Sequence, residues 1–206
     1  MRKGQVLVAM LLLVAAVAMV GCAKPPQPDI DASKAALSAA EQAEAPKYAP
    51  DAWDKAQQAT NAVNAELEAQ NAKFALFRSY TKAKQLITDA TNAANAAKDA
   101  AVAGKEKAKT DAKAAIDAAK ASLDNADKLF AEIEKCPRAK RAKEVKKDLE
   151  TVKGNLDGYK NQMAELDSKF TKEDFVGAKA QADTLKGQVD PVATDLEGIK
   201  TKFKCK

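Results

Sequence analysis

The side chains best suited to covalent chemistry in this chain of 206 residues are its three cysteines, Cys22, Cys136 and Cys205. The sequence contains no histidine, the residue that most often serves as a general base or metal ligand. It also has no Cys-x-x-Cys pair, no glycine-rich phosphate loop and no Ser/His/Asp set. We therefore predict a non-enzymatic protein, without catalytic residues, metal ligands or a cofactor, whose cysteines serve attachment and cross-linking.

Cys22 follows a segment with the layout of an export signal. Arg2 and Lys3 form a positive start, residues 5–20 are almost wholly apolar, and Gly21 is the small residue before the cysteine. An apolar run of 16 residues is short for a membrane span, which needs roughly 20. This layout predicts a cleaved signal peptide rather than a transmembrane helix.

The sequence Met-Val-Gly-Cys at residues 19–22 resembles a bacterial lipobox, although methionine replaces the usual Leu, Val or Ile at its first position. The resemblance implies that residues 1–21 are removed and that Cys22 carries a diacylglycerol and an acylated amino terminus. Residues 22–28 would then be a proline-rich tether. By resemblance to Gram-negative lipoproteins, Ala23 in place of aspartate implies an outer-membrane anchor facing the periplasm. A simple export signal with an incidental cysteine, or an uncleaved anchor, is the alternative.

The composition predicts an all-α protein. Hydrophobic residues make up 46% of the chain but aromatic residues only 5%, and charged residues of both signs make up 31%, which suits long solvated helices. Alternating strand patterns are nearly absent. Without Arg2 and Lys3 the net charge falls from +5 to +3, which is too small to indicate nucleic-acid binding.

The amino-terminal half, residues 29–103, is predicted to form an alanine-rich helical hairpin or bundle. A helix over residues 29–44 ends at the Ala-Pro-Lys-Tyr-Ala-Pro stretch, and a second helix starts at Pro50. A turn is expected at residues 70–73. The second helix carries an apolar seam at coiled-coil spacing, formed by Trp53, Ala56, Thr60, Val63 and Leu67.

The Ala-Pro-Lys-Tyr-Ala-Pro stretch at residues 45–50 follows a run of alanines. In this it resembles a family of bacterial envelope lipoproteins that carry a small helical domain of unknown function and have a Tyr-Ala-Pro turn as their hallmark. The resemblance covers residues 30–101. It implies fold and location only, because the family has no agreed activity.

Residues 74–135 are predicted to form one long helix, since they contain no proline and only one glycine, Gly104. Its seam is interrupted by a stutter between Ala108 and Ile116, which leaves a thin, alanine-rich middle. We expect a continuous helix that joins two elongated antiparallel coiled-coil or three-helix bundles. The alternative is a break near Gly104 that lets the halves fold together. The thin middle is also a candidate for self-association.

Residues 104–206 are predicted to form a three-helix bundle. After Pro137, one seam runs from Val145 to Phe170 and a second from Phe175 to Phe203, with a turn at residues 171–174 between them. The seam over residues 116–133 supplies the third face. Pro191 predicts a kink or a re-capped break in the last helix.

The two later cysteines are predicted to form a disulfide. Helices of similar length on either side of the turn would return Cys205 to Cys136, and an exported protein meets an oxidising compartment. Two free thiols are the alternative.

Cations are concentrated at the same end of this bundle and oppose the dipole of the helix that starts there. They predict a docking surface for an anionic envelope component or an acidic protein, such as lipid A phosphates or an anionic glycan. A merely solvated, charged helix end is the plainer interpretation. The set comprises Lys135, Arg138, Lys140, Arg141, Lys143, Lys146 and Lys147, with Lys200, Lys202, Lys204 and Lys206.

The sequence as a whole predicts a non-catalytic structural or interaction protein. A first alternative is a covalent peptidoglycan tether, because the basic ending at Lys206 is similar to that of the murein lipoprotein, whose terminal lysine is linked to peptidoglycan. The greater length and the interrupting Cys205 depart from that family. A second alternative is a periplasmic carrier or adaptor for a lipid or protein client, although alanine-rich packing leaves little room for a cavity.

Overall fold

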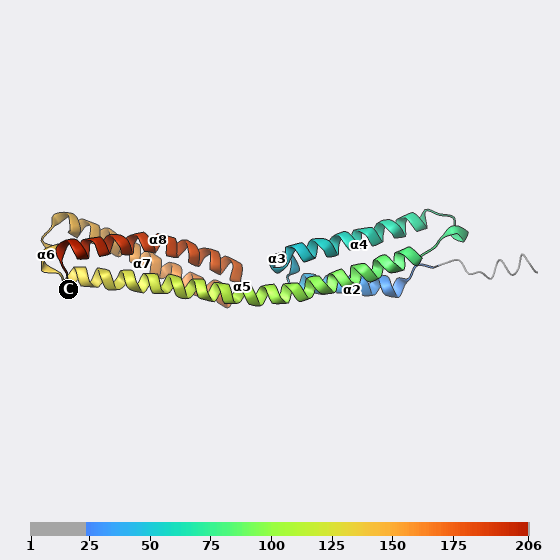
Figure 1. Ribbon diagram of the computed structural model, residues 1–206, viewed down its shortest axis with the longest axis horizontal. Coiled ribbons are helices and arrows are strands. Elements are labelled where there is room, and N and C mark those ends of the chain that lie inside the picture. Colours follow the sequence, from blue (N-terminus) through green and yellow to red (C-terminus); the bar gives the residue numbers. More distant parts are fainter. Residues whose placement is uncertain (1–23, 206) are drawn as a thin grey trace, which may run out of the picture. The chain divides into compact units, whose positions relative to one another are not determined.

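The computed structural model describes residues 24–205, and within this range the chain is all-helical and contains no strand (Figure 1). The predicted signal peptide, the predicted lipid-attachment residue Cys22 and the predicted cell-wall attachment residue Lys206 lie outside the described residues. The chain divides into two compact units, Met1–Val102 and Ala103–Lys206. The 55-residue helix α5 contributes residues to both.

The described residues form seven α-helices and one short 3₁₀ turn, η1. In chain order they are α2 (Gln27–Gln42), α3 (Ala45–Tyr48), α4 (Pro50–Asn71), η1 (Ala75–Phe77), α5 (Thr81–Lys135), α6 (Pro137–Lys140), α7 (Lys143–Thr171) and α8 (Phe175–Phe203).

Prolines lie in the first turns of α2, α3 and α4. Pro50 begins α4, as predicted from its preorganised backbone angle. The predicted tether over residues 22–28 is too long, because α2 already begins at Gln27. Pro28 lies in the first turn of that helix, where a missing N–H is not needed for a hydrogen bond.

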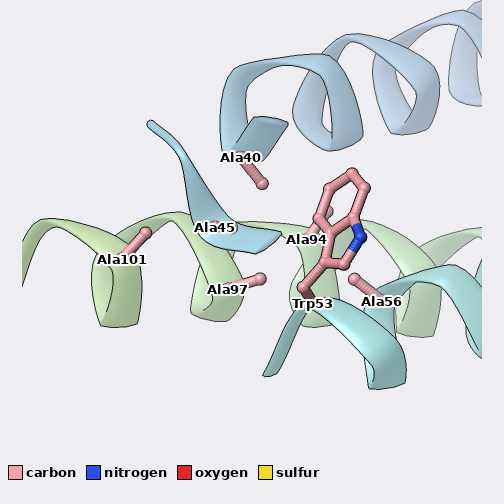
Figure 2. Packing of buried hydrophobic residues seen from close by; sticks show 7 residues of the cluster. All are labelled: Ala40, Ala45, Trp53, Ala56, Ala94, Ala97 and Ala101. Atoms are coloured by element: carbon pink, nitrogen blue, oxygen red, sulfur yellow. The ribbon is translucent and has the colours of Figure 1, made fainter. Parts of the chain in front are cut away.

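One tryptophan among alanines forms the main core of the first unit (Figure 2). Trp53 lies against small residues of α2, α3, α4 and α5, which are Ala40, Ala45, Ala56, Ala94, Ala97 and Ala101. Alanine lets helix backbones approach closely, and the indole fills the space between them. A second cluster joins Ile30, Val63, Ile87 and Ala90.

The predicted start of the long helix at Phe74 is wrong, because α5 begins at Thr81. Nine residues, 72–80, connect α4 to α5 instead of the short turn predicted at 70–73. Hydrogen bonds hold this connection outside the helix. The Ser79 backbone N–H donates to Gln70 Oε1 at 3.0 Å, and the Arg78 guanidinium donates to backbone carbonyls of α4 and the connection, each at 3.0 Å.

The α4 seam also ends differently from the prediction. Leu67 is only half-buried, whereas Glu66 and Gln70 are buried. Glu66 accepts a hydrogen bond from Gln70 Nε2 at 2.6 Å and pairs with Lys82 Nζ at 2.7 Å. These bonds satisfy the buried polar atoms at this end of the unit.

We predict that Glu66 makes the stability of the first unit depend on pH. The hydrogen bonds from Lys82 and Gln70 hold the pKa of the Glu66 carboxyl below its usual range. Its stabilising effect is therefore complete at neutral pH and is lost as the pH falls through that lowered pKa. Glu66→Gln should melt at a lower temperature than the wild type at pH 7, with a smaller difference at pH 3, measured by circular dichroism. An equal difference at both pH values would contradict this assignment.

The second unit is a helical bundle formed by α7, α8 and the second part of α5. Helices α7 and α8 have 29 residues each and contact one another. The turn between them contains Glu173 at a φ of 60° and Asp174, whose carboxylate accepts a hydrogen bond from the Gly177 N–H at 3.3 Å. Two ion pairs connect α5 to the other two helices, Asp127–Lys160 at 2.9 Å and Glu132–Lys200 at 2.6 Å.

Two details of this bundle differ from the sequence prediction. Helix α8 runs through Pro191 as one helix, so the re-capped break is absent. The predicted seam residues Phe130 and Val192 are half-buried, and their neighbours Leu129 and Ala193 are buried in their place. A straight helix with 3.6 residues per turn drifts relative to a heptad pattern, which moves the buried position by one residue.

Candidate functional site

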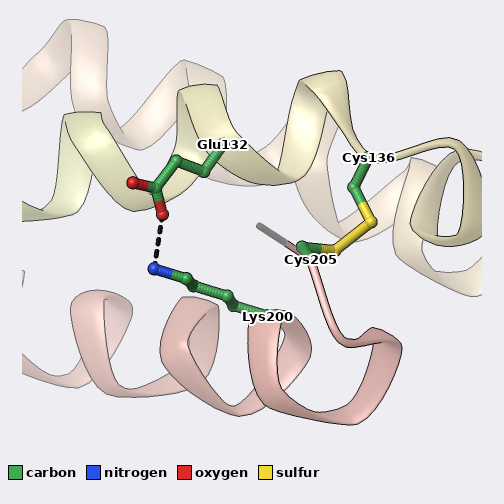
Figure 3. The surroundings of a disulfide bond; sticks show 4 residues. All are labelled: Glu132, Cys136, Lys200 and Cys205. Carbon is green, nitrogen blue, oxygen red and sulfur yellow. Dashed lines mark ion pairs between the residues drawn. A yellow bond between two sulfur atoms is a disulfide. The ribbon is translucent and has the colours of Figure 1, made fainter.

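A disulfide joins the two ends of the hairpin formed by α7 and α8. Cys136 and Cys205 are 69 residues apart in sequence, their Cα atoms are 5.5 Å apart, and their sulfurs are bonded (Figure 3). The prediction of this bond is confirmed. It links the residue directly after α5 to the second residue after the end of α8.

The backbone on both sides brings the two cysteines together. Cys136 is extended, with Pro137 starting α6 directly after it. At the other end Lys204 takes a left-handed conformation, with a φ of 47°. The Cys205 N–H then donates to the Lys200 carbonyl at 3.0 Å, the hydrogen-bond pattern of a Schellman helix end, which turns the chain out of α8.

Helix α6 is a single turn that closes this end of the bundle. Cys136 and Ala139 are buried, and α6 contacts both α7 and α8. The cations of α6 are therefore carried by a backbone that is held on one side by packing and on the other by the disulfide.

We call the cations of this region the basic end, defined as Lys135, Arg138, Lys140, Arg141, Lys143, Lys146 and Lys147 together with Lys202 and Lys204. Every member is exposed. Within residues 24–205, no member between positions 135 and 147 makes an ion pair, and this stretch contains a single acid, Glu144. Seven cations against one acid give the stretch a net charge of +6.

Lys200 is excluded from the basic end because its charge is already paired. Its Nζ lies 2.6 Å from Glu132 Oε2, and both side chains are partly shielded from solvent (Figure 3). Lys204, by contrast, lies one residue from the disulfide, so the bond brings it to the same end as Arg138.

A groove next to the basic end was not predicted from the sequence. It has a volume of about 410 Å³ and lies between α5, α6 and α7. Phe130 and Leu149 form its apolar part, and the rest of its lining is charged. The charged residues are Lys140, Lys146 and Lys153 with the acids Glu134 and Glu150. The only sequence signal for Lys153 is its place seven residues after Lys146, on the same helix face.

A second groove, of about 630 Å³, lies between α7 and α8. Its lining mixes apolar side chains such as Val152, Leu196 and Ile199 with the charged Asp148 and Asp195.

Comparison with protein-family models, curated proteins and solved structures found no match for this chain. Among the helices described, none is long and apolar enough to cross a membrane. Residues 24–205 contain no group of three or more His, Cys, Asp or Glu side chains that could hold a metal ion.

Proposed function

We propose that this protein is a lipid-anchored bacterial envelope protein of the outer membrane, facing the periplasm, which acts as a non-catalytic interaction protein. The proposed interaction rests on a single observation, the unpaired cations of the basic end. These cations lie beside the disulfide, where α6 packs against α7 and α8. The anchor is supported by the lipobox-like sequence at residues 19–22. The similarity to envelope lipoproteins with a Tyr-Ala-Pro turn supports the same location.

The charge pattern of the basic end favours binding over a structural role for its cations. Lys143, Lys146 and Lys147 lie in the first turns of α7, where positive charge opposes the helix dipole. They gain no compensating ion pair within the described residues. An anionic partner would relieve this repulsion, since it adds negative charge at the helix start. We infer that the basic end docks an anionic envelope component or an acidic protein surface.

The first experiment on this proposal is an intact mass measurement on protein isolated from its native envelope. We expect the mass of three acyl chains on Cys22 and an unmodified Lys206. A muropeptide on Lys206 would instead establish the peptidoglycan tether. An unmodified Cys22 would refute the anchor. Small-angle X-ray scattering on the same material tests the elongated arrangement predicted from the sequence.

The docking surface is tested with a photo-crosslinking amino acid in place of Lys143, introduced in living cells. We expect a crosslinked partner whose yield falls about tenfold in Arg138→Gln/Lys140→Gln/Arg141→Gln, because three exposed ion pairs of about 0.5 kcal/mol each are lost. The same probe at Lys172, an exposed lysine in the turn after α7, is the matched control. It should not crosslink the partner that is captured from position 143. Equal yields from the triple variant and the wild type would refute the docking role.

A further inference from the structure

Where α4 connects to α5, large apolar side chains are exposed to solvent and polar side chains are buried, the reverse of the usual distribution. Phe74, Leu76 and Phe77 are 69%, 63% and 75% exposed, and we call these three side chains the apolar tip. In the last turns of α4, just before this connection, the polar Glu66 and Gln70 are buried. Scattered single apolar side chains on a surface need no explanation, but a cluster of large ones does. In a chain with only 5% aromatic residues, two exposed phenylalanines three positions apart are the most apolar surface feature described.

The fold holds the apolar tip outward rather than leaving it to collapse. Gln70 Oε1 accepts hydrogen bonds from the Ser79 N–H at 3.0 Å and from Lys73 Nζ at 3.2 Å. The Tyr80 hydroxyl and Asn71 Oδ1 are 3.1 Å apart. These bonds join both ends of the connection to α4. The η1 turn between them presents the two phenylalanine rings together, with centroids 6.4 Å apart.

The apolar tip lies at the end of the first unit from which the chain leads back to Cys22. Ile30 of α2 belongs to the same core cluster as Ile87 of α5, and Ala40 belongs to the same cluster as Ala97. Helices α2 and α5 therefore run in the same direction, and the start of α2 is at the same end as the start of α5 (Figure 1). Antiparallel α4 ends there as well.

Chain length confines Cys22 to the neighbourhood of the apolar tip. Cys22 lies five positions before the start of α2 at Gln27, and five residue steps span at most about 18 Å when the chain is fully extended. Ile87 shares a core cluster with Ile30 of α2 and lies six residues after Thr81, the first residue of α5. At 1.5 Å per residue, the start of α5 is therefore about 9 Å along the helix axis from Ile87. A lipid on Cys22 would therefore bring this end of the unit to the bilayer surface.

We propose that Phe74, Leu76 and Phe77 insert into the headgroup and acyl boundary of the membrane leaflet that holds the lipid on Cys22. This inference rests on the anchor in the proposed function. Aromatic and aliphatic side chains flanked by cations are suited to that boundary, and residues 72–80 contain Lys73 and Arg78 but no acid. The anchor keeps the tip at a high local concentration, so that a weak affinity suffices for stable insertion. Insertion would orient the first unit so that the end with the apolar tip faces the membrane.

The test uses the chain from Cys22 to Lys206, which keeps every helix described, with its disulfide intact. Cys22 is then the one free thiol and can be coupled to maleimide lipids in phosphatidylcholine vesicles. This chemical anchor does not depend on acylation in the cell. Its result is thus separate from the intact-mass result: an unmodified Cys22 in cells would refute the proposed anchor without changing what the vesicles report.

Phe77→Trp places a fluorophore in the apolar tip, and Gln57→Trp, at an exposed position within α4, is the matched control. Buried Trp53 supplies a constant baseline in both variants. With brominated acyl chains we expect at least twofold quenching of the added Phe77→Trp emission and none of the added Gln57→Trp emission. Equal quenching of the two would overturn the proposal. A concentration-dependent blue shift of Phe77→Trp without vesicles would also overturn it, because a second copy of the chain would then cover the tip.

A second measurement removes the apolar tip at positions where side chains make little contact. Phe74→Ser/Leu76→Ser/Phe77→Ser should retain the wild-type circular dichroism spectrum, since all three positions are exposed. Amide hydrogen exchange across residues 72–80 should slow by at least threefold when the wild type is coupled to vesicles, and should not change when the triple variant is coupled. Equal slowing in both proteins would show that the apolar side chains are not the inserted group.

Discussion

Replacing both cysteines of the disulfide, in Cys136→Ser/Cys205→Ser, should lower the free energy of unfolding of the second unit by about 4 kcal/mol. The bond closes a loop between residues 69 apart, and a cross-link over a long loop removes much of the conformational freedom of the unfolded chain. The folded bundle should survive, because its core contains fully buried Leu156, Leu166, Leu185 and Leu196. The double variant should therefore unfold more readily, and the residues after α8 should no longer be held next to Cys136.

Hydrogen exchange measures this effect within a single unit. Amides of α7 and α8 that exchange only by global unfolding should lose about 4 kcal/mol of protection, and amides of α2 and α4 should lose much less. In the unacylated chain from Cys22 to Lys206, Cys22→Ser is the matched control, since it removes a thiol that takes no part in the bond, and it should leave both sets unchanged. Protection in α7 and α8 that stays at the wild-type level would contradict a stabilising role for the disulfide.

The same double variant tests whether the disulfide organises the basic end. Without the bond, Lys204 is no longer tied to Cys136 and Arg138. The Glu132–Lys200 pair remains as a connection between α5 and α8. Crosslinking from position 143 should therefore weaken less than in the charge variant at positions 138, 140 and 141.

Trp53→Ala should lower the free energy of unfolding of the first unit by about 3–5 kcal/mol, the range for deleting a large buried aromatic side chain. The buried neighbours of the indole are alanines from four helices, whose methyl groups cannot fill the space (Figure 2). The larger side chains Leu37 and Tyr48 pack against the same cluster and are only partly buried. Because few side chains could move into the cavity, we expect a cost within this range.

Trp53 is the one tryptophan of the chain, so its substitution removes the tryptophan fluorescence that would otherwise report unfolding. The lower free energy of unfolding can instead be measured by hydrogen exchange in α2 and α4. Trp53→Phe is the control, since it keeps an aromatic ring and should cost clearly less than alanine. The amides of α7 and α8 should report little change, which would separate the two compact units. A loss below about 1 kcal/mol in Trp53→Ala would mean that the alanines alone hold the core.

The sequence by itself determined the features that depend on neighbours along the chain. Prolines and apolar periodicity predicted the start of α4 at Pro50 and the turn between α7 and α8 at residues 171–174, because helix starts, stops and faces are set by residues within one or two turns. The disulfide followed from equal helix lengths on either side of that turn. The cationic stretch at 135–147 could likewise be read from composition alone.

The tertiary structure alone decided features that depend on distant contacts. The apolar spacing from Phe74 onward predicts helix, but two sets of hydrogen bonds keep residues 72–80 outside it. The Ser79 N–H donates to Gln70 Oε1, and the Arg78 guanidinium donates to the carbonyls of Asn71 and Lys73. The exposure of the apolar tip follows from those bonds. Likewise Lys153 joins Lys140 at one groove only after α6 packs on α7. Such contacts join residues that local patterns treat separately, and their geometry exists only once the helices have packed.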